Sequence, residues 1–322
     1  MLALLFKVLG AKKVMRFFPP IVTGPMIIMI GLNLAGSAVS NVMTCWWLAL
    51  VAIVVVVIAN IWGKGMLKII PILLGVVVSY IVALIAGQVD FTAVKDADFV
   101  GLQQFIIAKF DISAILVMAP IAIAAMMEHI GDVSAISSPT GRNFIGDPGL
   151  HRTLLGDGLA TALAGFFGGP ANTTYGENTG VLALSKVYDP RVVRLAAYFA
   201  IILSFSPKFD ALVNSIPAAV VGGVSFILYG MISAVGVRNI VENRVDLTKS
   251  RNLIIAAVMF VSGLGFTSVG GITFTVGGAA ITLSGLAIAA ILGVLFNAIL
   301  PGNDYVFGAN PEGDKSADMG SY

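Results

Sequence analysis

The sequence NTTYGENTG, residues 172–180, is a polar stretch between apolar segments, and it carries one carboxylate, Glu177. The preceding GGP at 168–170 is expected to end a helix. The Thr-Thr-Tyr that follows favours extended backbone, and Gly176 permits a backbone angle that other residues avoid. GENTGVLALSKVY then predicts a new helix. We therefore expect a short half-strand plus half-helix at about 171–187.

The composition of the chain excludes an ordinary soluble domain. Its 322 residues are 58% hydrophobic and only 11% charged, whereas soluble domains carry roughly 25% charged residues. The apolar residues are gathered in uncharged stretches long enough to cross a bilayer. We predict an all-α polytopic membrane protein in which the broken segment 171–187 is flanked by apolar spans, at about 18–38, 46–62, 67–88, 113–131, 153–168, 191–206, 212–236, 251–266 and 280–300.

The charges between the spans give the orientation. Lysine and arginine gather in alternate connections, which fits the positive-inside rule only if 171–187 crosses the membrane. Both ends of the chain are then cytoplasmic, and no cleavable signal peptide is evident. The net charge of +2 is spread over short loops, which argues against nucleic-acid binding. The tail at 301–322 is polar and is expected to be disordered.

Glu128 is the first candidate for function. It follows sixteen uncharged residues, 112–127, and a carboxylate inside a membrane span must face a protein interior or a water-filled cavity. In the alternative interpretation this is the cytoplasmic end of the span, where Glu128, His129 and Asp132 meet water.

Glu177 is the second candidate. At the first turn of a half-helix it would lie beside unpaired backbone N–H groups and the positive end of the helix dipole. Irregular backbone at membrane depth is tolerated only where it is buried in protein or lines a cavity, and a broken helix with a charged tip is typical of transporter sites. The alternative is a surface loop with Glu177 as a solvated cap.

Three stretches carry a more specific resemblance: FFPPIVTGPMIIMIGLNLAG near the start, AAMMEHIGD, and DPGLHRTLLGDGLATALAGFFGGPANTTYGENTGV. Together they resemble the nucleobase–ascorbate transporter family (nucleobase:cation symporter-2), and within it the bacterial uracil permeases. The similarity runs to about residue 300. It implies fourteen segments in inverted seven-segment repeats, with a core domain that holds the substrate and a gate domain that rocks against it.

The chain departs from the family pattern at its beginning. Its first span is similar to the family's fifth segment, so the resemblance implies that the chain is N-terminally incomplete and lacks the first four segments. The implied domains are a cytoplasmic lead-in, first-repeat gate spans, core spans with the substrate site, second-repeat gate spans and a disordered tail, at 1–17, 18–111, 112–208, 209–300 and 301–322 respectively.

The resemblance also implies roles for individual residues. The implied substrate-binding residues are Glu128, Tyr175, Gly176, Glu177 and Tyr229. The implied proton-coupling residues are Glu128, Asp132, Glu177 and Asn178. Asp132 stands where the uracil permeases have a histidine in EHxGH, so coupling through this position is an open question.

The chemistry of uracil fits these residue types. Carboxyl groups can accept from its ring N–H groups, and backbone N–H groups can donate to a carbonyl. Two partly desolvated carboxyls would hold protons more readily, which suggests a proton symporter with no other cofactor. We expect a multi-pass protein of the bacterial cytoplasmic membrane and a homodimer through the gate domain, with a nucleobase and the lipid bilayer as its other partners.

Four alternatives remain at this point, and the first is that the chain as given is an inactive fragment of the transporter that it resembles. A xanthine permease or another nucleobase permease would share the fold, although glutamine is typical of xanthine-selective relatives where this chain has Glu177. An anion transporter of the same fold would need an electropositive site. A membrane enzyme is disfavoured, because no catalytic triad, metal cluster or phosphate loop is visible. His129 and His151 lie in different regions, and GDGLATALAG is interpreted as small-residue helix packing.

Overall fold

The computed structural model describes most of the chain, namely residues 7, 16–102, 105–112, 114–115, 118–119, 122, 125–126, 129–130, 132–133, 136, 140–142, 144–174, 182, 187–276, 279–303 and 305. The chain divides into two compact units. The first contains Met1–Asn33, Ile106–Thr179 and Met231–Tyr322, and the second contains Leu34–Phe105 and Gly180–Gly230. Each unit is described by itself below.

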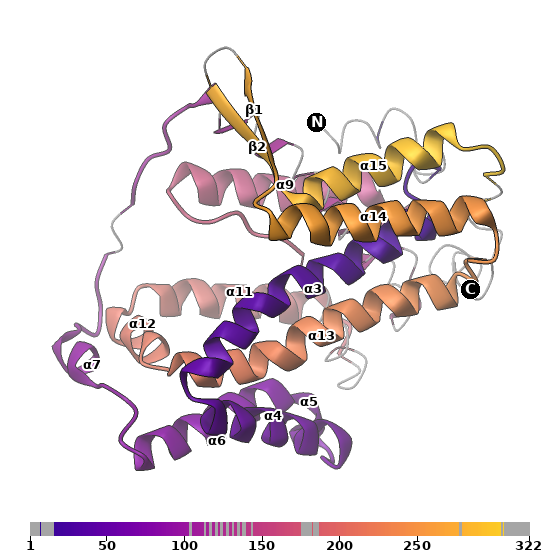
Figure 1. Ribbon diagram of the computed structural model, residues 1–322. Helices are drawn as coiled ribbons and strands as arrows, with labels where there is room; N and C mark the ends of the chain where they lie inside the picture. Colours follow the sequence, from indigo (N-terminus) through magenta and orange to yellow (C-terminus); the bar gives the residue numbers. More distant parts are fainter. Residues whose placement is uncertain are drawn as a thin grey trace. The chain divides into compact units, whose positions relative to one another are not determined.

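Helices dominate the described residues, and one two-stranded sheet accompanies them (Figure 1). In chain order the elements are α3 (Pro20–Thr44), α4 (Trp46–Ile61), α5 (Met66–Ile69), α6 (Pro71–Ile85), α7 (Thr92–Asp96), the short kinked segment η1 (Ile145–Gly149), α9 (Leu150–Phe166), α11 (Pro190–Ser204), α12 (Pro207–Asn214), α13 (Ala218–Glu242), α14 (Ser250–Ser268), β1 (Ile272–Val276), β2 (Ala279–Leu283) and α15 (Gly285–Ile299).

The described helices include several that can cross a membrane. By length and composition α3, α13 and α14 qualify, and α11 with α12 makes a fourth span if this pair, bent by 96°, counts as one. The apolar helices α4, α6 and α15 are shorter. The predicted all-α polytopic membrane protein is therefore confirmed.

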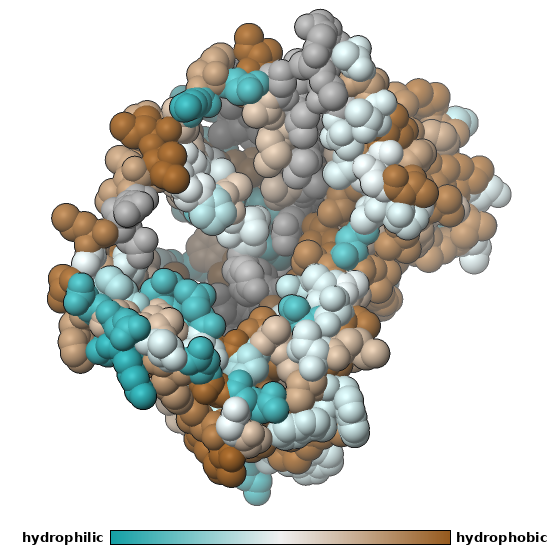
Figure 2. All heavy atoms as spheres, turned by 60° about the vertical axis from the view of Figure 1, so that its left-hand side comes forward, coloured by the Kyte–Doolittle hydropathy of each residue, from teal (hydrophilic) through white to brown (hydrophobic). Residues whose placement is uncertain are grey.

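Helix α9 shows that the protein is built for an apolar solvent. Leu155, Leu159 and Leu163 recur every four residues and are 52%, 61% and 62% exposed, whereas Asp157 and Thr161 on the other face are half-buried. A water-soluble helix has the opposite arrangement. Figure 2 shows hydrophobic residues, in brown, at many places on the face that it draws. These surfaces are suited to contact with lipid.

The first unit is built around the antiparallel pair α14 and α15, which lie side by side in Figure 1. Their contact is close because small residues face each other: a Cβ on Gly285 would meet the N atom of Thr267 at 2.6 Å. Buried side chains of α3, chiefly Met26 and Met29, belong to the same core. Small residues at such contacts let membrane helices approach closely.

The second unit is built around α4 and α6. Its core includes the fully buried Leu48, Ala49 and Ala83, together with Val220 from the start of α13. Helix α6 begins with Pro71 in its first turn, where the missing N–H of proline costs no hydrogen bond. The turn before α13 is attached to α6 through Ser215, whose hydroxyl lies 2.6 Å from that of Tyr80.

The predicted beginning of the span at 280–300 was wrong, because the helix there, α15, begins at Gly285. Residues Ala279–Leu283 form β2, which pairs antiparallel with β1 so that Ile272 lies opposite Leu283 and Val276 opposite Ala279. The sequence ITFTVGGAAITL alternates β-forming residues around Gly-Gly, which is the pattern of a hairpin. Helix α15 begins only after Ser284, whose hydroxyl accepts from the Ala287 amide at 3.3 Å.

The predicted span at 212–236 also has a different boundary. Helix α12 ends at Asn214, and α13 begins at Ala218 and continues to Glu242. Pro217 lies between them, and proline lacks the N–H that an uninterrupted helix needs at this position.

Candidate functional site

Most of the predicted site residues lie outside the described part of the chain: Glu128, Tyr175, Gly176, Glu177 and Asn178. The remaining two are described. Asp132 is buried, at 8% exposed, in the first unit. Tyr229 is half-buried on α13 in the second unit. The predicted roles of all seven residues stay predictions.

The described residues nevertheless show how the flanks of the predicted site are held. His129 directly follows Glu128, and Thr174 lies three positions before Glu177. The residues 171–174, called segment 171–174 below, have no regular secondary structure. Both His129 and segment 171–174 contact α9.

His129 and segment 171–174 contact one polar face of α9. Thr153, Asp157 and Thr161 recur every four residues, so that they lie on one side of the helix, and all three are half-buried. Polar side chains in a membrane helix normally face the protein interior and pair with one another. The side chains of this face supply the hydrogen-bonding groups described next.

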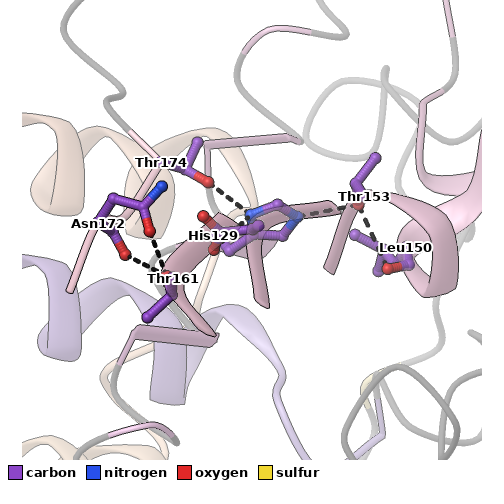
Figure 3. Close-up of polar contacts among 7 residues, drawn as sticks. His129, Leu150, Thr153, Thr161, Asn172 and Thr174 are labelled. Carbon is purple, nitrogen blue, oxygen red and sulfur yellow. Dashed lines mark hydrogen bonds and ion pairs between the residues drawn. The ribbon is translucent and has the colours of Figure 1, made fainter. Parts of the chain in front are cut away.

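His129 joins three parts of the chain (Figure 3). Its ring is buried, at 4% exposed. Nδ1 lies 2.5 Å from the hydroxyl of Thr174, and Nε2 lies 2.9 Å from the hydroxyl of Thr153 on α9. Nδ1 is also 3.7 Å from a carboxylate oxygen of Asp157. A single imidazole therefore links its own segment, α9 and segment 171–174.

The tautomer of the neutral ring decides the direction of both threonine bonds. When Thr153 donates its hydroxyl hydrogen to the carbonyl of Leu150 at 3.3 Å, it accepts from Nε2 of His129, and Thr174 then donates to Nδ1. In the other tautomer Thr153 donates to Nε2, and Nδ1 donates to Thr174. A protonated ring would instead donate from both nitrogens and form an ion pair with Asp157.

Two turns further along α9, Thr161 holds the beginning of the same segment. Its hydroxyl donates to the backbone carbonyl of Asn172 at 2.9 Å, and the side-chain carbonyl of Asn172 is a second partner. Figure 3 shows both contacts. Segment 171–174 is thus attached at Asn172 and at Thr174.

The turn after α9 explains why the segment can run back along the helix. The helix ends at Phe166, and Gly168 follows with a positive φ of 80°, as is common after helix ends. A Cβ at Gly168 would meet the carbonyl oxygen of Ile106 at 2.7 Å. The segment that contains Ile106 is also bonded to the end of α9, because the Ala108 amide donates to the carbonyl of Phe166 at 3.0 Å. The prediction that GGP ends this helix is confirmed.

Sequence reasoning missed this polar cluster. GDGLATALAG was interpreted as small-residue packing, which overlooked Asp157 and Thr161 four residues apart. That spacing in an apolar helix was the available signal. Within the described residues, no group of three His, Cys, Asp or Glu side chains could hold a metal ion. The cluster is a hydrogen-bonding site made of hydroxyl, imidazole and carboxylate groups.

Comparison with known proteins identifies relatives of the whole chain. The profile of a permease family matches residues 1–272. The uracil permease of Bacillus subtilis is 41% identical over 320 residues, which are 94% of this chain and 72% of that protein. The probable uracil permease of Haemophilus influenzae is 39% identical, over 93% of this chain and 73% of that protein. A putative pyrimidine permease of Escherichia coli is 39% identical, over 91% and 66%.

Proposed function

Because this chain belongs to the nucleobase–ascorbate transporter family of permeases, we propose that it moves uracil across the cytoplasmic membrane as a proton symporter. The observation that carries the proposal is the similarity to proteins named uracil permease at about 40% identity over more than nine tenths of the chain. The lipid-suited surface of α9 agrees with a transmembrane carrier.

The proposed substrate site is formed by Glu128, Tyr175, Gly176, Glu177 and Tyr229. The two carboxylates accept from the ring N–H groups of uracil, and a backbone N–H near Gly176 donates to a ring carbonyl. The two tyrosines provide apolar faces for the ring.

Proton coupling is proposed to use Glu128, Asp132, Glu177 and Asn178. Acids inside the membrane are typical members of proton relays, and the burial of Asp132 fits such a role. An acid here, in place of the histidine of the uracil permeases, would be neutral rather than cationic when protonated. The proton is the only coupling ion proposed.

The transport cycle is proposed to be alternating access. A core domain that holds the substrate rocks against a gate domain, as is common in transporters built from inverted repeats. The gate domain is also proposed to form a homodimer.

Uptake of radiolabelled uracil tests this proposal in cells that lack their own uracil permease. The chain is expressed as printed and, separately, with any upstream coding sequence of its gene. Uptake is measured at an external pH of about 5.5 and of about 7.5, which lie on either side of the ordinary pKa of histidine. We expect uptake that is faster at acidic pH and that a protonophore abolishes. Uptake whose rate is the same at both pH values and is unchanged by the protonophore would contradict proton symport.

Two variants test the proposed acids. Glu177→Gln is expected to remove uracil binding and Glu128→Ala to abolish uptake, because each loses a carboxylate acceptor. Glu242→Gln is the matched control, since Glu242 is exposed and pairs with Arg238 four residues earlier at 2.6 Å. Normal uracil affinity in purified, folded Glu177→Gln would remove this residue from the site.

A second candidate substrate is another pyrimidine. The similarity to a protein named putative pyrimidine permease favours it. Competition for uptake by thymine, cytosine, xanthine and sulfate separates the possibilities. Competition by thymine that is as strong as that by uracil would favour a general pyrimidine carrier, whereas competition by xanthine or sulfate alone would favour the purine or anion alternatives.

A further inference from the structure

The cluster on α9 holds both flanks of the proposed substrate site, and no proposed substrate contact explains it. We propose that His129 is a positioning residue, which through its hydrogen bond with Thr174 fixes segment 171–174 against α9 and thereby sets the affinity of the adjacent site. This inference rests on the proposed function, because the site that is positioned is the uracil site.

His129 bonds to side chains that are distant from it in the sequence. His129 and Thr174 are 45 residues apart and His129 and Thr153 are 24 apart, so these bonds join parts of the chain that have no local reason to meet. Glu128 is the neighbour of His129, and Tyr175, with which the proposed substrate-binding stretch begins, is the neighbour of Thr174. A bond between the two flanks limits how far the two proposed acids can separate.

Few attachments hold segment 171–174 in place. A segment without regular secondary structure lacks the ladder of hydrogen bonds that holds a helix or strand. Segment 171–174 is attached instead through Asn172 to Thr161 and through Thr174 to His129. Affinity is greater when a binding segment is already ordered before the ligand arrives. Loss of one attachment should therefore weaken binding without removing a substrate contact.

The imidazole of His129 is buried and fully hydrogen-bonded. The His129 ring is 4% exposed and both of its nitrogens have threonine partners. Buried polar groups with complete hydrogen bonding hold one arrangement, and removal of one partner leaves the other without its bond. The pair is therefore suited to defining a single position of segment 171–174.

The test uses Thr174→Val, which removes the hydroxyl and keeps the shape, and Thr174→Ser, which restores a hydroxyl. The matched control is Thr267→Val, because Thr267 donates only within α14, to the carbonyl of Gly263 at 2.6 Å. We expect Thr174→Val to weaken equilibrium uracil binding by about five- to tenfold, as the loss of one hydrogen bond would. Serine and the control should stay within about twofold, a difference of less than 0.5 kcal/mol by the same conversion.

A double-mutant cycle gives a readout that a general loss of stability would not produce. If the two side chains act through their shared bond, Thr174→Val in a His129→Ala background should weaken binding no further. Fully additive effects, or unchanged affinity in Thr174→Val, would overturn the proposal.

Hydrogen exchange of the ligand-free protein separates this inference from the proposed function. Thr174→Val should speed amide exchange in segment 171–174 whatever the substrate is, because the attachment is lost. Faster exchange in a protein that binds no nucleobase would support the positioning role and contradict the uracil site. Unchanged exchange in a protein that binds uracil would contradict the positioning role alone.

Discussion

Arg251 at the start of α14 and Asn297 near the end of α15 are joined twice, because one guanidinium nitrogen lies 2.8 Å from both the backbone and the side-chain oxygen of Asn297. Asn297 in turn donates to the carbonyls of Arg16 and Phe17 at 3.0 and 3.3 Å. The amide side chain is buried. It therefore ties the turn before α3 to the α14–α15 pair within the first unit.

Asn297→Ala should accordingly destabilise the first unit. The substitution removes the side-chain oxygen that accepts from Arg251 and leaves the carbonyls of Arg16 and Phe17 without their donor, and we expect the free energy of unfolding to fall by about 2 kcal/mol. Titration with SDS in mixed micelles measures it. Asn243→Ala is the control, because Asn243 directly follows α13 and donates only to the carbonyl of Asn239 in that helix, four residues earlier, and its effect should be about 1 kcal/mol or less. Equal effects of the two variants would contradict the cross-helix role.

Gly236→Ala should disrupt the contact between α3 and α13 in the first unit. A Cβ at Gly236 would lie 2.6 Å from the backbone nitrogen of Ile28 and 2.8 Å from the carbonyl oxygen of Gly24. Backbone atoms cannot rotate away as a side chain can, so we expect a loss of about 1–3 kcal/mol. The yield of monodisperse protein and its unfolding midpoint measure the effect.

Gly230→Ala is the control for this substitution, on the same helix, because a Cβ at Gly230 meets nothing within 4 Å. It should be neutral or slightly stabilising, since alanine favours a helix over glycine. A Gly236→Ala protein as stable as the Gly230→Ala protein would show that the two helices do not approach so closely.

Tyr80→Phe should weaken the second unit. Ser215 donates its hydroxyl hydrogen to the carbonyl of Leu212 at 2.7 Å, so Tyr80 is the donor in the 2.6 Å bond between the two hydroxyls. Its loss should cost about 1 kcal/mol, measured by SDS titration. Tyr198→Phe, at a site that is 61% exposed on α11, should change stability by less. A larger loss of stability in Tyr198→Phe than in Tyr80→Phe would contradict the bond between Tyr80 and Ser215.

Asp90 gives a prediction for pH. The Thr92 hydroxyl, at 2.6 Å, and then the Thr92 amide, at 2.8 Å, hydrogen-bond to the Asp90 carboxylate and lower its pKa. A pKa that is lower in the folded state means that ionised Asp90 stabilises the protein above its unfolded pKa. That contribution is lost as the pH falls through the folded pKa.

Thr92→Val removes the larger of these two interactions and should raise the pKa of Asp90 toward its ordinary value. Carbon NMR titration of labelled aspartate carboxyls measures it, with Asp90→Asn to assign the signal. Thr248→Val is the matched control, because Thr248 makes the same pair of bonds to Asp246. It should leave the titration of Asp90 unchanged. An unaltered pKa in Thr92→Val would remove the hydroxyl as the cause.

The helices that the sequence predicted well are those whose position depends on a local property, the length of an uninterrupted apolar run. The span predicted at 46–62 corresponds to α4 at Trp46–Ile61, and that at 251–266 lies within α14 at Ser250–Ser268. Hydropathy and the length of an apolar run are enough here, because a helix satisfies its own backbone in lipid. The family also followed from local information, because each motif that indicated it consists of residues adjacent in the sequence.

The membrane class, most of the helices and the family of the chain could be read from the sequence, because these depend on residues that are close together along it. The pairing of β2 with β1, in place of the first turns of a helix, became known from the folded structure. The contacts of His129 with Thr153 and Thr174 also became known only from the folded structure. Polar side chains at such distances have many possible partners, and the packing of α9 against its neighbours selects among them.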